Sequence, residues 1–475
     1  MKLLTRLLGL WVLTSFILSA HAGSIQDHAF TNLDHPQVKP LMDDIDGHLN
    51  EGQFDQVVAK GEDVQVWLAK SNLPRTVQAY YLNNLSIALA RAGETNQALV
   101  TSQQAVELLE GLTPFHPDLY HVMMAKGYIL VYEGAFDEAE DALRHAQHIA
   151  HRNQGVYAKD QLPTLRLLTD VLANTGKDRD ADQTQRFFLK VNEQIYGAAS
   201  EEMIPSLAEV GNYFANRGRG IPSGQARTQT VYTVGRNRSI ELSQPEADIT
   251  YRSRLFREAE IAFERSIAII EGKYGSTDLR LVEPLKGLSK TKFLEGYARS
   301  YAEAPMEKMV AIVHQNPGSD VADKARALVE LGDLYIKTED ARAEETYKKA
   351  WDLLSDPEHD DLRYSLFGRP VRLLPEYNFR PTLPRYPVDL EPDQQLYVDL
   401  TYNVLANGRV RQVHVVDSNI PLRNQKQTRT GVKYMKFRPR MVDGELVDTN
   451  DLSLHQTFTV LRPEPVFESN ISVNP

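Results

Sequence analysis

The sequence predicts a mainly α-helical protein, in which a solenoid of helix pairs is followed by a small α+β domain. Two patterns support this fold class. Apolar and small residues recur with a period near 42 residues between positions 36 and 355, and apolar residues alternate as in strands over positions 396–460. A chain of 475 residues is also long enough for two or three domains.

The helical repeat is clearest at Ala98, Ala139 and Ala181, which lie 41 and 42 residues apart. Each follows an apolar helical stretch that ends in glycine, and a late copy spans residues 331–350. Apolar residues at i, i+3 and i+4 give each helix one apolar face, and a glycine after the first helix favours a left-handed cap. Since one pair cannot bury its apolar face alone, we expect the pairs to stack. The spacing resembles the tetratricopeptide family, in a long form, over residues 36–355.

An insertion interrupts the fourth repeat over residues 218–252. Residues 217–257 contain eight arginines and three acids, and Thr228–Val234 alternates as a strand does. One interpretation is a protruding basic hairpin that holds a partner or an anionic polymer of the cell envelope. The favoured one is a tolerated surface insertion, partly disordered.

The N-terminus has the pattern of a secretory signal peptide, predicted over residues 1–22. Two basic residues precede an apolar run of 14 residues from Leu7 to Ala20, and a small-x-small site predicts cleavage between Ala22 and Gly23. The run is shorter than the roughly 20 residues of a spanning helix. The sequence therefore predicts a periplasmic protein with no transmembrane segment. The alternative is an uncleaved anchor in the inner membrane, with the chain facing the periplasm.

Charge and composition narrow the function classes. The net charge is -11, with about -15 on residues 23–364 and about +4 on residues 365–462, which does not suggest nucleic acid as a partner. The absence of cysteine excludes a disulfide framework, cysteine-ligated zinc and thiol catalysis.

Enzyme motifs are absent from the sequence. It has no Walker loop, G-x-S-x-G, H-E-x-x-H or G-x-G-x-x-G motif, so we predict no catalytic residue and no cofactor. His145, His148 and His151 lie three residues apart on a predicted helix, and two of them could share a metal. Side chains six residues apart on a helix point about 120° from each other, so a solvated surface is favoured and no metal site is predicted.

The C-terminal hundred residues predict two strands, a helix and a final strand. Prolines mark a connector over residues 356–380. A hairpin turn is expected at Asn407-Gly408, and a helix over residues 422–435 should direct Lys426, Arg429 and Lys433 outward. The apolar residues expected on the inner strand faces are Leu396, Val398, Leu400, Tyr402, Val404, Val413, Val415, Leu452, Leu454, Phe458 and Val460.

This order resembles the C-terminal domain of the TonB family, the periplasmic energy transducers of diderm bacteria, over residues 381–462. The matching features are Tyr386-Pro387, the turn at Gly408-Arg409-Val410, Phe437-Arg438-Pro439 and the closing Phe458. The resemblance implies that an extended peptide of an outer-membrane receptor adds to a free sheet edge. The partner-binding residues it implies are Tyr386, Pro387, Phe437, Arg438, Pro439, Leu454, Gln456 and Phe458.

These features together predict a non-enzymatic periplasmic scaffold or adaptor. It would bind proteins or extended peptides of the cell envelope through a helical-repeat groove, and by strand addition to the TonB-like domain. The alternative is a TonB-type transducer for outer-membrane transport, which requires the N-terminal segment to remain as an anchor. Residues 463–475 are expected to form a disordered tail.

Overall fold

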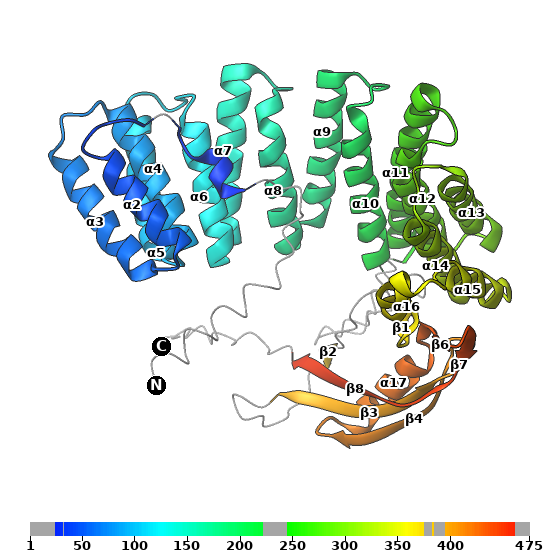
Figure 1. Ribbon diagram of the computed structural model, residues 1–475. Coiled ribbons are helices and arrows are strands. Elements are labelled where there is room, and N and C mark those ends of the chain that lie inside the picture. The colour runs from blue at the N-terminus through cyan, green and yellow to red at the C-terminus, as the bar shows by residue number, and fades with distance from the viewer. Residues whose placement is uncertain (1–23, 32, 222–244, 375–381, 384–394, 461–475) are drawn as a thin grey trace, which may run out of the picture. The chain divides into compact units, whose positions relative to one another are not determined.

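Antiparallel helix pairs account for most of the chain, and a small set of strands follows them (Figure 1). The computed structural model describes residues 24–31, 33–221, 245–374, 382–383 and 395–460. The chain divides into two compact units, Met1–Phe214 and Ala215–Pro475, which are described in turn.

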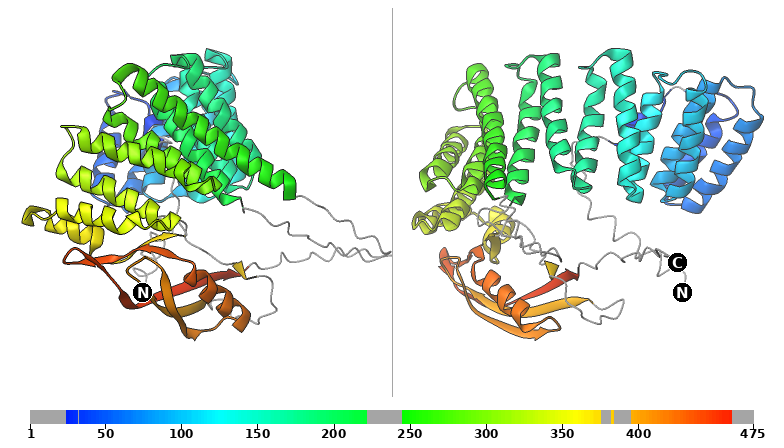
Figure 2. Two further views of the ribbon diagram at one scale, coloured as in Figure 1. Left: turned by 90° about the vertical axis from the view of Figure 1, so that its right-hand side faces the viewer. Right: turned by 180° about the vertical axis from the view of Figure 1, so that it is seen from behind.

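The first unit consists of helix pairs, each packed on the next, and Figure 2 shows the same pairs from behind. A short 3-10 helix, η2 (Ile25–His28), precedes them. The helices are α2 (Lys39–Asn50), α3 (Phe54–Lys70), α4 (Arg75–Arg91), α5 (Thr95–Glu110), α6 (Leu119–Glu133), α7 (Phe136–Gln154), η3 (Lys159–Gln161), α8 (Leu162–Asn174), α9 (Asp178–Tyr196) and α10 (Met203–Gly220), the last of which runs across the unit boundary.

Glycine ends the first helix of successive pairs, as the sequence predicted. Gly93, Gly134 and Gly176 have φ of 85°, 81° and 73°, in the left-handed region that favours glycine. After α6, the Gly134 N–H donates to the Val131 carbonyl and the Ala135 N–H donates to the Leu130 carbonyl. These bonds satisfy carbonyls at the helix end and turn the chain into the second helix.

Small residues lie where helices cross. Ala98, Ala139 and Ala181, which mark the predicted repeat, are fully buried on the second helices of their pairs, α5, α7 and α9. Gly127 of α6 is equally constrained, because a Cβ added there would lie 2.8 Å from Leu143 Cδ2 on α7. The tetratricopeptide-like helical repeat is thus present in the packing as well as in the spacing.

The second unit continues the helix pairs and ends in strands. Its helices are α11 (Pro245–Tyr274), η4 (Leu279–Leu281), α12 (Val282–Glu295), α13 (Arg299–Gln315), α14 (Val321–Thr338), α15 (Arg342–Leu353), η5 (Pro357–His359) and α16 (Asp360–Phe367). Its strands and last helix are β1 (Val371–Leu374), β2 (Thr382–Leu383), β3 (Leu396–Val404), β4 (Val410–Ser418), α17 (Leu422–Lys433), β5 (Lys436–Arg438), β6 (Arg440–Val442), β7 (Glu445–Val447) and β8 (Thr449–Val460).

Four strands form the main sheet, in the order β2-β8-β3-β4. β3 pairs antiparallel with both β4 and β8. β2 pairs parallel with β8, and only with Thr459 and Val460, the last two residues of β8. Residues of β3 alternate strictly between buried and half-buried, and α17 packs against β4 (Figure 2). The predicted strand–strand–helix–strand order is therefore present, with Lys426, Arg429 and Lys433 of α17 exposed.

Two expectations about domain organisation differ from the structure. The predicted connector 356–380 folds over much of its length, into η5, α16 and β1. The strands also share one compact unit with the later helices, because β1 pairs with β5 and β5 packs on α14. Two small sheets, β1-β5 and β6-β7, were not predicted, since strands of three or four residues leave little periodicity.

Several predictions fall on residues outside the described ranges. They are the signal peptide and its cleavage site at Ala22 and Gly23, the strand-like Thr228–Val234, and the tail 463–475. The ends of the predicted insertion are described and belong to α10 and α11.

The crossing of α14 and α15 gives a test of the packing. A Cβ at Gly332 would lie 2.5 Å from Cε1 of Tyr347, which is fully buried and has no room to move. We expect Gly332→Ala to destabilise the second unit by about 1–3 kcal/mol through overpacking. Hydrogen exchange by mass spectrometry should show faster exchange in α14 and α15.

Gly47 provides the matched control, because it lies within α2 and a Cβ there would meet nothing within 4 Å. Gly47→Ala should stabilise its helix by about 0.5–1 kcal/mol. Equal exchange rates in the Gly332→Ala and wild-type proteins would contradict the packing argument.

Candidate functional site

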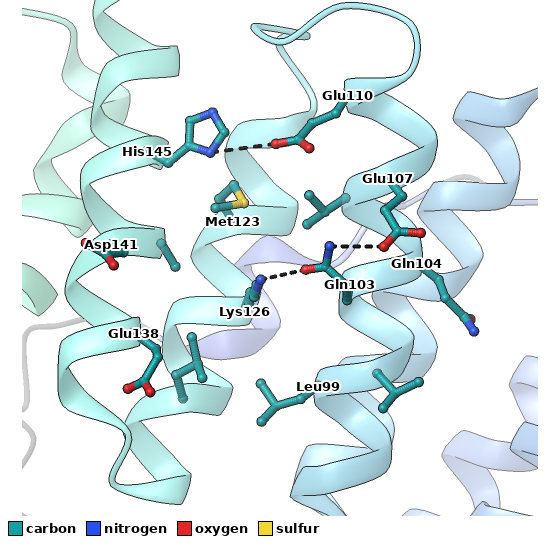
Figure 3. Close-up of a pocket in the computed structure, with 14 residues that line it drawn as sticks. Leu99, Gln103, Gln104, Glu107, Glu110, Met123, Lys126, Glu138, Asp141 and His145 are labelled. Carbon is teal, nitrogen blue, oxygen red and sulfur yellow. Dashed lines mark hydrogen bonds and ion pairs between the residues drawn. The ribbon is translucent and has the colours of Figure 1, made fainter.

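A groove in the first unit runs between α5 and α7, with α6 as its floor (Figure 3). Its volume is about 790 Å³. Val100 is 61% exposed at this site, an unusual position for a valine on a well-packed helix. The apolar lining residues are Leu99, Val100, Val106, Met123, Leu130 and Ala142.

The polar rim of the groove is mostly acidic. Four carboxylates line it, from Glu107, Glu110, Glu138 and Asp141, against the single ammonium of Lys126. An apolar floor with an excess of negative charge suits an amphipathic segment that carries Lys or Arg beside apolar side chains.

Hydrogen bonds hold the one lysine of the groove against α5. Lys126 Nζ donates to Gln103 Oε1 at 2.7 Å, and Gln103 Nε2 donates to Glu107 Oε1 at 3.2 Å (Figure 3). Burial lowers the pKa of Lys126, although Glu110 and Glu107 oppose the shift. On the far side, His145 Nδ1 lies 3.9 Å from Glu110 Oε1.

Two of the three histidines on α7 contact different partners, and the third, His148, is exposed. His145 faces Glu110 in the groove, whereas His151 Nε2 lies 2.7 Å from Gln161 Oε1 of η3. Within the described ranges, no group of three His, Cys, Asp or Glu side chains could hold a metal ion. The lining residues of the groove include no serine, threonine or cysteine.

The second candidate site is the outer edge of β8. From Thr449 to Phe458 this strand pairs on one side with β3, and β2 reaches only Thr459 and Val460 on the other. In the part of the chain that the structure describes, no strand pairs with the rest of that edge. Its free N–H and C=O groups can therefore pair with an extended peptide.

Of the residues implied by the TonB resemblance, Leu454, Gln456 and Phe458 lie on β8, whereas Phe437 and Arg438 lie on β5 and Pro439 follows it. Phe437 is buried, with its ring centroid 5.8 Å from that of Tyr402. Pro439, two residues further along the chain, is also buried. Leu454 and Phe458 face the sheet core, and the Gln456 amide donates to the Thr457 carbonyl at 2.8 Å. Tyr386 and Pro387 lie outside the described residues.

The contacts of Arg438 differ from the expectation that this residue binds a partner. Its guanidinium forms a two-pronged ion pair with Asp333 of α14, at 2.8 Å and 2.7 Å, and donates to the Leu366 carbonyl at 2.9 Å. The Tyr347 hydroxyl of α15 donates to the same Asp333 at 2.8 Å. Arg438 is thus used inside the unit, where it joins β5 to the last helix pair, and its side chain is not free to bind a partner.

A second polar contact joins the same elements at the surface. Glu339, at the end of α14, pairs with Arg409 at 2.8 Å and with Lys436. These charges lie beside a cavity of about 560 Å³ that includes Ile336 and Leu446. Since Glu339, Arg409 and Lys436 are already paired with one another, this cavity is a weaker candidate for a binding site than the α5–α7 groove.

No protein-family model and no curated protein matches this chain. It is similar to a solved structure of nearly identical TPR-like repeats from a putative kinesin light chain of Podosopora anserina, at 14% identity, over 52% of this chain and 100% of that one, with a TM-score of 0.37. BtubC (BKLC) from P. vanneervenii matches at 13% identity over 72% of this chain and 98% of that one, with a TM-score of 0.26. The assembly chaperone Acl4 of RpL4 matches at 13% identity, over 61% and 96% of the two chains, with a TM-score of 0.29. At these TM-scores the alignments carry no functional argument, and the helical repeat rests on the packing described above.

Proposed function

We propose that this protein is a non-enzymatic scaffold that binds segments of other proteins in the α5–α7 groove. The observation that carries the proposal is the groove itself, an apolar trough of about 790 Å³ with four carboxylates and one lysine around it. Such a surface favours an extended or helical segment that presents apolar and basic side chains. Residues 23–475 would act in the periplasm after removal of the signal peptide, as the N-terminal pattern predicts.

Strand addition at β8 would supply a second binding mode. The free edge from Thr449 to Phe458 supports this mode, because strand addition requires backbone N–H and C=O groups at a sheet edge that no other strand pairs with. The resemblance to the TonB family suggests an outer-membrane receptor as the source of the peptide. The described residues include no helix long and apolar enough to cross a membrane. The alternative function is an anchored transducer, which requires residues 1–22 to stay attached to the chain, and sequencing the N-terminus of the mature protein decides between the two.

Groove binding can be tested with peptides selected from a random displayed library on the full chain. We expect the selected peptides to combine apolar residues with Lys or Arg, and to bind more weakly as salt rises. Val100→Asp should weaken their binding at least about tenfold, because it places a carboxylate among the apolar lining residues of an already acidic groove.

Val66→Asp is the matched control, since Val66 is 55% exposed on α3 and does not line the groove. It should leave peptide binding unchanged. Equal weakening by both substitutions, or by neither, would refute the groove as the binding site.

The sheet edge needs a separate test, because truncation before residue 381 also removes Arg438 and leaves Asp333 and Tyr347 buried without their cation. A photoreactive residue at Thr457 on β8 should crosslink an added receptor-derived peptide. The same residue at Val416, which is exposed on the edge strand β4, should not. Crosslinking from Val416 alone would move the proposed site to the opposite edge.

A further inference from the structure

The chain segment before α2 lies against the face formed by α4 and α6, beside α6 in Figure 1. It comprises residues 24–35 and is described except at position 32. Ser24 caps η2 at its start, and His28 is 4% exposed at its end. We refer to residues 24–35 as the N-terminal strap.

Two neighbouring asparagines of α4 hold the backbone of the strap. Asn84 Nδ2 donates to the Phe30 carbonyl at 2.7 Å, and the Phe30 N–H donates to Asn84 Oδ1 at 2.8 Å. Asn83 Nδ2 donates to the His28 carbonyl at 2.9 Å. The Asn84 carboxamide therefore satisfies both the N–H and the C=O of Phe30. In a β-sheet, a neighbouring strand would form these two hydrogen bonds.

Aromatic side chains of α4 and α6 determine which strap residues fit against this face. The Phe30 ring stacks on Tyr80 of α4, with 4.0 Å between ring centroids and 22° between planes. The His28 ring lies 5.7 Å from that of Tyr128 on α6, and its Nδ1 is 3.4 Å from Nδ1 of His121. The strap thus contributes an aromatic anchor and a buried imidazole, two residues apart, to a pre-formed aromatic face.

The contact of the strap with α4 and α6 resembles the binding of an extended peptide more than the packing of one helix on another. The backbone is held through side-chain amides, so the strap's main-chain contacts do not depend on its sequence, and selectivity comes from Phe30 and His28. We propose that the strap is a displaceable intramolecular ligand, and that the α4/α6 face takes an extended segment of another protein that carries an aromatic residue. The proposal goes beyond groove binding, because it adds a second face and a means of closing it.

The test uses the absence of cysteine in the chain. Ile25 belongs to the strap and is only 3% exposed, so Ile25→Cys gives a single thiol that reacts only when the strap opens. Its labelling rate in the full chain is compared with that of the same cysteine in the free strap peptide. An added peptide with the sequence of residues 24–35 should compete with the strap and raise the labelling rate in proportion to its concentration.

Two variants make the result specific. A peptide with alanine in place of Phe30 should not raise the rate. Asn84→Ala in the chain should raise the basal rate about tenfold or more, since it removes two hydrogen bonds, and should abolish the response to the wild-type peptide. Asn174→Ala, which removes only a bond to the Asp170 carbonyl on α8, should change neither rate.

The outcomes are separable from those of the groove test. A labelling rate that does not respond to millimolar peptide shows that the strap is a fixed part of the fold and overturns the proposal. An equal response to the wild-type and alanine peptides overturns the assigned role of Phe30. Neither result bears on Val100, which lines the α5–α7 groove.

Discussion

Asp333→Ala is expected to destabilise the second unit by about 3–5 kcal/mol, because it leaves a buried guanidinium without its anion. The side chains of Arg438 and Asp333 are only 11% and 14% exposed. Burial by itself would lower the pKa of Arg438, but the hydrogen bond and the charge of Asp333 raise it. The pair is therefore a requirement of the fold once Arg438 is buried. Urea unfolding and hydrogen exchange of α14 and β5 measure the loss.

Glu339→Ala is the control for this prediction. Glu339 also joins α14 to the strand region, through Arg409 and Lys436, but about half of its side chain is exposed. Solvent screens such pairs, so the substitution should cost less than about 1 kcal/mol. A similar loss from Asp333→Ala and Glu339→Ala would contradict the distinction between the buried and exposed pairs.

A triple replacement separates the cost of breaking the cluster from its net contribution. Asp333→Leu with Arg438→Met and Tyr347→Phe removes the polar groups of all three side chains, keeps similar volumes, and leaves the Leu366 carbonyl without its Arg438 donor. Because no buried charge remains, we expect a stability within about 2 kcal/mol of the wild type. A loss as large as that of Asp333→Ala would show that the cluster stabilises the unit through its hydrogen bonds.

Sequence patterns predicted the parts of this fold that rest on periodicity. The β3 alternation from Leu396 to Val404, the exposed cations of α17 and the glycine caps after α4, α6 and α8 are all confirmed. Each depends on residues close together in the chain, where spacing specifies which side faces the core. The acidic rim of the groove could also have been suspected, since the repeat region carries most of the negative charge.

Long-range contacts between polar residues were not predictable in this way. Arg438 was assigned to a partner from a local motif, whereas its anion lies 105 residues away on α14. The Asn84–Phe30 contact spans 54 residues and involves a segment with no periodicity at all. A polar residue's partner is set by which helices stack, and one sequence does not specify that geometry.

The strap contact is expected to weaken as pH falls below about 6.5, the usual pKa of histidine. Burial is the main cause that lowers the pKa of His28 in the closed strap to about 4, the charge of His121 adds to it, and Asp27 opposes it. Burial also lowers the pKa of His121, against Asp118 and Asp160. The other titratable groups facing His28 are Tyr120 and Tyr128 of α6, which stay neutral because burial raises their pKa.

The direction of the pH effect on strap closure follows from the protonation of His28 in the closed and open strap. Above pH 6.5 the imidazole is neutral whether the strap is closed or open, so pH has no effect. Between pH 6.5 and about 4 the open strap binds a proton that the closed strap does not, and closure loses about 1.4 kcal/mol per pH unit. The equilibrium constant for closure should therefore fall roughly thirtyfold between pH 7.5 and pH 5.

The Ile25→Cys labelling rate measures this change when it is divided at each pH by the rate of the free strap peptide, which removes the titration of the thiol itself. The ratio should rise steeply below pH 6.5 in the wild-type background. In His28→Gln most of that rise should disappear, because only His121 remains to titrate at this contact. His48→Gln changes a half-buried histidine of α2 that lies beside Gln53 and away from the strap, and it should keep the full rise. A ratio that is flat from pH 7.5 to pH 5, or one that rises equally in His28→Gln, would show that the buried imidazole does not control the strap.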